Sequence, residues 1–166
     1  MNIRAQLAWV VGALLAVGLF PARAGAEHFQ IELSVAGAND KATAGADTSP
    51  PAQGHRPRPV CHAKAGEPLV LQFFFTSNFP HNTIKNVKVR YYVTAEEKVG
   101  QSAVPPRGDA SVAEGEFTMD FKPETGKVGL RQKMQLDKKG VYLVRVESDN
   151  SDNDHEHFAA IDLVIE

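Results

Sequence analysis

The chain has 166 residues, a formal net charge of −2 and a single cysteine. This length favours one domain, and one cysteine excludes an intramolecular disulfide. Basic residues form no stripe along the chain, so nucleic acid is not an expected partner.

Residues 1–26 have the three-part pattern of a secretory signal peptide. Arg4 supplies the positive start, the run from Leu7 to Phe20 is apolar and uncharged, and Ala24-Gly25-Ala26 offers a cleavage site. The apolar run is shorter than the roughly 20 residues that span a bilayer. We therefore expect an exported protein, periplasmic or extracellular, whose mature domain covers residues 27–166 and has no transmembrane segment. An uncleaved N-terminal anchor is the alternative.

The first half of the predicted domain alternates apolar and polar residues with period two, which predicts strands. Residues 28–35 give the first strand. Residues 36–59 are rich in Ala, Gly, Asp and Pro, and this composition predicts a long flexible loop. A brief strand follows at 60–63. Residues 69–76 are dense in Leu, Val and Phe, so we expect a central strand buried on both faces.

The second half continues the same pattern without a helical period. A loop at 77–82 holds His81, and 95–113 reads as a weak edge and a loop. Further strands are predicted at 87–94, 117–122, 128–136, 141–147 and 158–165. The whole pattern predicts an all-β fold, a β-sandwich of about seven to eight antiparallel strands.

Local motifs give this sandwich a family resemblance. Residues 137–142 place a Gly and then Tyr142 at the start of the next-to-last strand, 65–68 form a turn before an apolar strand, and 83–93 alternate like a third strand. Residues 60–166 thereby resemble immunoglobulin-like and fibronectin-type β-sandwich domains of secreted bacterial proteins. The resemblance implies a tyrosine corner, in which the Tyr142 hydroxyl bonds to backbone a few residues upstream. It implies little about function.

The polar segment 149–157 is the most distinctive candidate for a metal site. Its oxygen donors suit a hard cation such as calcium, and its imidazoles suit zinc or copper. An immunoglobulin-like topology brings the loop 77–82 to the same end of the sandwich. A hydrated polar loop without metal is the alternative. The candidate ligands are His81, Asp149, Asp152, Asp154, His155 and His157.

Cys61 and His62 form a second candidate, because thiolate and imidazole together suit a soft or borderline metal. A buried cysteine in a short strand is the alternative, and burial is common for a lone cysteine. A reactive thiol or an intermolecular bridge is also open. This pair is expected at the end of the sandwich opposite His155, so the two candidates should not form one site.

No hydrolase elbow, P-loop, dinucleotide fingerprint or zinc-protease pair occurs in the sequence. We therefore expect a non-enzymatic exported binding or structural module without a cofactor other than a possible divalent cation. The alternative is a periplasmic or extracellular metal-binding protein that uses the loop His and Asp residues. The loops at one end would supply any recognition surface of the module, and another envelope or extracellular protein is its possible partner. A third alternative is a subunit of a larger envelope assembly that engages partners through an exposed strand edge.

Overall fold

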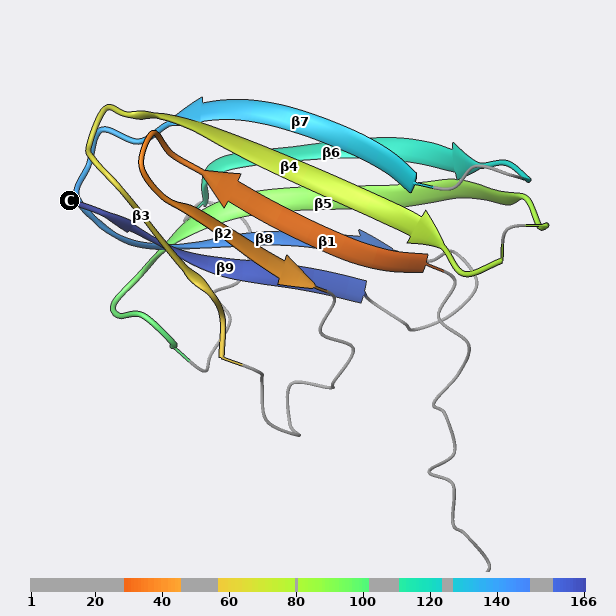
Figure 1. The fold of residues 1–166 in the computed structure, drawn as a ribbon, viewed down its shortest axis with the longest axis horizontal. Helices are drawn as coiled ribbons and strands as arrows, with labels where there is room; N and C mark the ends of the chain where they lie inside the picture. Colours follow the sequence, from red (N-terminus) through yellow and green to blue (C-terminus); the bar gives the residue numbers. More distant parts are fainter. Residues whose placement is uncertain (1–28, 46–56, 80, 102–110, 124–126, 150–156) are drawn as a thin grey trace, which may run out of the picture.

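The computed structural model describes residues 29–45, 57–79, 81–101, 111–123, 127–149 and 157–166. Within these ranges the chain forms nine β-strands and no helix, and the strands make two sheets packed face to face (Figure 1). The predicted all-β sandwich is confirmed, with more strands than expected. No helix in the described ranges could span a membrane.

The two sheets contain four and five strands. The first has the spatial order β2-β1-β4-β7 and the second the order β3-β9-β8-β5-β6. The first sheet consists of β2 (Lys41–Gly45), β1 (Phe29–Ala36), β4 (Pro68–Ser77) and β7 (Lys127–Gln135). The second consists of β3 (Val60–Ala63), β9 (His157–Ile165), β8 (Gly140–Asp149), β5 (Ile84–Glu96) and β6 (Ser111–Phe121).

Strand pairing departs from the prediction at β3. The described pairings are antiparallel except that of β3, which lies parallel to β9 with Val60 opposite Asp162. A parallel neighbour needs a crossover rather than a hairpin, and β3 and β9 come from distant parts of the chain. The expectation of antiparallel strands throughout is therefore wrong at this edge.

The hydrophobic core lies between the sheets, and β4 shows why. Leu69, Leu71, Phe73 and Phe75 alternate along this strand and are almost completely buried, because residues two apart share one face of a strand. Burying each such side chain contributes about 1.5–3 kcal/mol. The opposite face of β4 is only half-buried along 70–76, because it forms the outer surface of the sheet. The expectation of burial on both faces is corrected accordingly.

The predicted loop at 36–59 contains a strand that sequence reasoning missed. Ala42 and Ala44 are buried while Lys41, Thr43 and Gly45 are exposed, which is the alternation of an edge strand. Alanine is a weak strand former, so its small apolar side chain did not register as a core position. The core contact of β2 is nevertheless made by these two methyl groups.

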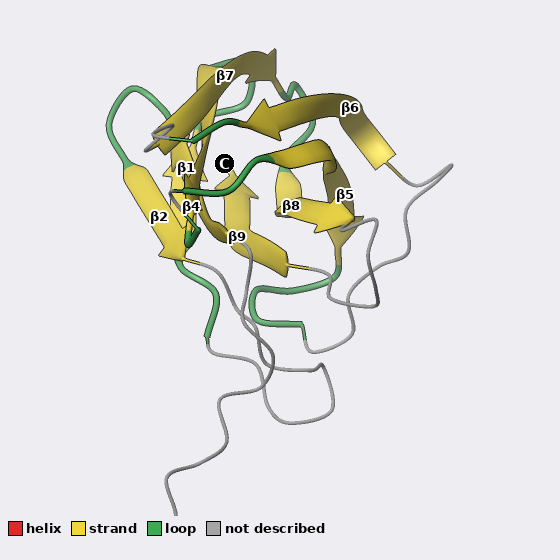
Figure 2. Ribbon diagram, turned by 90° about the vertical axis from the view of Figure 1, so that its right-hand side faces the viewer, coloured by secondary structure: helices red, strands yellow, loops and turns green. Residues whose placement is uncertain are grey.

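The two sheets contact each other where β9 lies against β1 and β2. Figure 2 shows the edge strands β6 and β7 together on another side of the molecule.

The predicted tyrosine corner is present at the start of β8. The Tyr142 hydroxyl donates a hydrogen bond to the Lys138 carbonyl at 2.8 Å.

Candidate functional site

Three of the predicted metal ligands, Asp152, Asp154 and His155, lie outside the described residues. Their arrangement therefore stays a prediction. Asp149 ends β8 and His157 begins β9, at the end of the sandwich where β4 leads into β5. His81 is exposed in the connection between β4 and β5.

The register separates His81 from this pair of strand ends. Asp149 lies opposite Lys88, whereas β5 begins at Ile84. This first part of β5 contains a bulge around Asn86, and it extends past the last β8 pairing before the chain reaches His81. Among the side chains that are described, no three His, Cys, Asp or Glu residues are grouped as a metal site would require.

Cys61 and His62 point in different directions from β3. Cys61 is fully buried, with its Sγ 3.6 Å from the Val35 carbonyl oxygen, and burial raises the pKa of its thiol. The exposed His62 ring lies 3.2 Å from Glu166. Cys61 pairs with Leu163, six residues along β9 from His157, so it lies well away from the start of that strand. The cysteine is a core residue.

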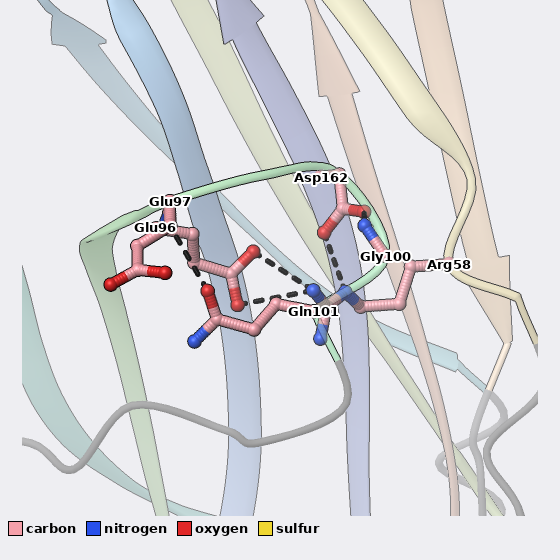
Figure 3. A network of polar contacts seen from close by, with 6 residues as sticks. All are labelled: Arg58, Glu96, Glu97, Gly100, Gln101 and Asp162. Atoms are coloured by element: carbon pink, nitrogen blue, oxygen red, sulfur yellow. Dashed lines mark hydrogen bonds and ion pairs between the residues drawn. The ribbon is translucent and has the colours of Figure 1, made fainter.

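A buried polar network lies on the outer side of the five-stranded sheet (Figure 3). Arg58, just before β3, donates from Nη2 to both carboxylate oxygens of Glu96 at 3.0 and 2.8 Å. Its Nε donates to Asp162 of β9 at 2.5 Å, and the Gly100 amide donates to the other Asp162 oxygen at 2.7 Å. Both carboxylate side chains are completely buried.

This network contains more negative than positive charge, because one guanidinium faces two carboxylates. Burial raises the pKa of Glu96 from 4.5 to about 7, with Arg58 opposing the rise and Asp162 adding to it. The network therefore takes up a proton near neutral pH. The oxygens of both carboxylates accept hydrogen bonds from Arg58 or Gly100. The network is therefore suited to holding these segments of the chain together.

The outer face of the four-stranded sheet is a second candidate site, because hydrogen-bonding side chains surround one aromatic ring there. Its cross-strand rows carry mainly side chains that donate and accept hydrogen bonds. The rows that surround Phe74 contain Gln30, Glu32, Ser34, Thr43, Gly45, Gln72, Phe74, Thr76, Lys127, Gly129 and Arg131, and the next row contains Lys41, Ala36, Val70 and Lys133. Antiparallel strands present such a face as a broad, gently twisted surface.

Phe74 is the aromatic residue on this outer face. It stands opposite Gly129, where an added Cβ would lie only 2.9 Å from the ring. The ring therefore lies across the glycine, close to the sheet. The Lys127 ammonium sits 4.2 Å from the ring centroid and 3.6 Å from a Glu32 carboxylate oxygen.

Neither the Arg58 network nor the outer face of the four-stranded sheet was identified from the sequence. Arg58 lies in the Pro-rich stretch predicted as loop, and its partners Glu96 and Asp162 are 38 and 104 residues away. Such a contact has no local signature. For Phe74, the alternation along 69–76 was the available signal, but the adjacent phenylalanines obscured it.

Comparison with known proteins gives structural neighbours only. No protein-family model and no curated protein matches this chain. The PmoD soluble domain from Methylocystis sp. ATCC 49242 (Rockwell) is 10% identical, with coverage of 82% of this chain and 90% of that one and a TM-score of 0.42. A chitin binding domain from Burkholderia pseudomallei is 14% identical, with coverage of 71% and 61% and a TM-score of 0.41.

An AA10 lytic polysaccharide monooxygenase from Streptomyces lividans is also similar, at 12% identity and a TM-score of 0.33. Coverage is 70% of this chain and 64% of the monooxygenase. This chain thus spans less than two thirds of the length of that enzyme and of the chitin binding domain.

These comparisons correct our functional expectation. We expected a non-enzymatic module of unknown ligand, with a metal-binding protein as the alternative. Beside the PmoD soluble domain, the neighbours include structures described as a chitin binding domain and as polysaccharide monooxygenases. The expectation of a module without an indicated ligand was wrong because it rested on a fold resemblance and on missing motifs, and neither defines a ligand. The metal-binding alternative stays a prediction.

Proposed function

We propose that the protein binds an extended carbohydrate chain on the outer face of its four-stranded sheet, with Phe74 as the platform. One observation carries this proposal: an aromatic ring lies across a glycine within a broad, mainly polar sheet face. A pyranose ring has an apolar C–H face and a rim of hydroxyl groups. A flat aromatic ring among hydrogen-bonding side chains matches both features.

The hydrogen-bonding groups around Phe74 have suitable chemistry for sugar hydroxyls. Gln72, Gln30 and Arg131 supply amide and guanidinium donors, and the two glutamines also accept. Around Phe74, within the described part of this face, Thr43 and Ser34 share a hydrogen bond of 3.5 Å and Lys127 contacts Glu32 and the Phe74 ring, whereas Gln30 and Gln72 form no side-chain hydrogen bond there. The glutamines are thus available to a ligand.

The Lys127 ammonium must move away from the Phe74 ring before a sugar can stack on that ring. Its side chain is about half-exposed, and an exposed cation–π contact is worth only about 0.5–1 kcal/mol. Glu32 lies beside it and can hold the ammonium after it moves. We therefore expect Lys127→Ala to retain or strengthen binding, because it uncovers the platform.

Sedimentation with insoluble chitin and cellulose, and affinity electrophoresis in soluble polysaccharides, test the proposal. Chitin is one probe because a neighbouring structure is described as a chitin binding domain. We expect Phe74→Ala to weaken binding at least about tenfold, or 1.4 kcal/mol. Gly129→Val should weaken it too, because the new side chain displaces the ring.

Val99→Ala is the matched control, since it removes an exposed apolar side chain away from this sheet. Circular dichroism verifies the fold of each variant. The proposal is wrong if the wild-type protein binds none of the polysaccharides, or if Phe74→Ala binds as tightly as the wild type.

A further inference from the structure

Among the described residues each sheet ends in two edge strands, β2 and β7 in one sheet and β3 and β6 in the other. The strands β6 and β7 end their respective sheets, and they lie on the same side of the molecule (Figure 2). Unpaired edges offer rows of backbone donors and acceptors to another strand. β6 has 11 residues and β7 has 9, so both edges are long enough to pair extensively.

The two edges carry opposite charges. β6 contains three acidic residues and no basic one, whereas β7 contains three basic residues and no acidic one. Some of these charges already have partners, since Glu116 contacts Arg90 and Lys88 and Lys127 contacts Glu32. Glu114, Arg131 and Lys133 have no ion pair within the described ranges.

The inner faces of both edges leave apolar side chains partly uncovered. Leu130 faces the core side of β7, opposite Phe73, yet it is 37% exposed. Met134 on β7 and Phe117 and Met119 on β6 are only partly buried. A strand added at either edge would cover these groups.

We infer that two copies of this protein associate edge to edge, with β7 of each copy antiparallel to β6 of the other. The strands β6 and β7 of one copy run in opposite directions (Figure 1). A twofold rotation about an axis parallel to the strands preserves these directions. It places the partner's β6 beside β7 and the partner's β7 beside β6, so both junctions form together.

The same rotation matches the faces of the strands. At each junction the core-facing side of β7 continues into the core-facing side of the partner's β6. Leu130 and Met134 then adjoin the apolar side chains of that strand. On the outer side, Arg131 and Lys133 adjoin the acidic row that contains Glu114, and opposite charges across neighbouring strands are favourable.

A second copy fits these edges better than like-with-like pairing does. Two β6 strands would bring acidic rows together and two β7 strands would bring basic rows together, which is unfavourable. The twofold arrangement also closes, so the β6 and β7 edges of both copies are paired without filament growth. A closed dimer is therefore the arrangement that satisfies charge, apolar cover and strand direction at once.

Sedimentation velocity of the full domain tests this inference. At about 100 µM, a dimer with a Kd near 1 µM would be almost fully formed, so we expect twice the monomer mass. Arg131→Glu with Lys133→Glu should make both edges acidic, and Glu114→Lys with Glu116→Lys should make both edges basic. Each double variant should be monomeric, with association weakened at least about tenfold.

Mixing the two double variants gives the sharpest result. An acidic edge then meets a basic edge at both junctions, so the mixture should regain the dimer mass. Lys98→Glu with Lys139→Glu makes the same charge change at exposed sites outside both strands and should remain dimeric. A monomeric wild type, or a mixture that stays monomeric, would overturn the inference. These outcomes do not depend on carbohydrate binding, because no sugar is present.

Discussion

The hydroxyl of Tyr142 connects one side chain to the crossover between the sheets. The residue is 3% exposed, and its hydroxyl donates to the Lys138 carbonyl at 2.8 Å. Tyr142→Phe keeps the ring in the core and removes this bond. We expect the free energy of unfolding to fall by about 1–2 kcal/mol, because a carbonyl loses its partner.

Urea denaturation of the wild type and the variant measures this loss. Tyr91→Phe is the control, since its half-buried hydroxyl has no hydrogen bond among the described residues. Equal midpoints and slopes for wild type and Tyr142→Phe would contradict the expectation.

The thiol of Cys61 should be unreactive in the folded protein. It is fully buried, and burial raises its pKa, so the reactive thiolate is both scarce and inaccessible. We expect a colorimetric thiol reagent at pH 8 to react with one thiol per chain in urea and far more slowly without it. A native rate close to the unfolded rate would show that the thiol is accessible.

At the scale of strands, the sequence predicts those elements whose apolar residues alternate clearly. The segment Val60–Ala63 was predicted with the observed bounds, and most other strands were placed within a few residues. β2 was missed because its core contacts are two alanine methyl groups. The Arg58 network could not be predicted, since it depends on which strands become neighbours rather than on any local spacing. Tyr142 was predictable because its motif is local.

The pairing of β6 with β5 depends on a glycine. Gly115 lies opposite Tyr91, and an added Cβ would lie 2.4 Å from the Tyr91 ring. Gly115→Ala must therefore displace a ring that packs against Phe73 at a centroid distance of 5.2 Å. We expect a loss of about 1–3 kcal/mol in the free energy of unfolding.

Gly45→Ala is the matched control for this prediction. Its Cβ would meet nothing within 4 Å, so this substitution at the end of β2 should be close to neutral. Thermal denaturation of both variants provides the measurement. Similar melting temperatures for the two variants would show that the Tyr91 ring moves aside without cost.

At the scale of the whole molecule, the Arg58 network connects segments that are far apart in the sequence. Arg58 precedes β3, Glu96 ends β5, and Asp162 lies in β9. The amide of Gly100 joins the loop after β5 to the same carboxylate. Breaking one member of such a buried group leaves another charge without its partner, which is strongly destabilising.

The raised pKa of Glu96 makes the stability of the fold depend on pH. The folded state holds a proton on Glu96 up to about pH 7, whereas the unfolded chain releases it near 4.5. The folded state therefore binds more protons between these values, and its stability falls as pH rises through this window, by up to about 3 kcal/mol. The lowered pKa values of Asp40 and Glu67 act in the opposite sense and at lower pH, below about 4.5.

Glu96→Gln isolates this contribution, because the amide imitates the protonated acid and does not titrate. We expect the melting temperature of the wild type to fall relative to that of Glu96→Gln between pH 5 and pH 8. The difference should level off above the folded pKa. Glu97→Gln alters an exposed neighbour and should follow the wild-type curve. Parallel curves for wild type and Glu96→Gln would mean that Glu96 is already ionised in the folded protein at pH 5, with the Arg58 guanidinium outweighing its burial.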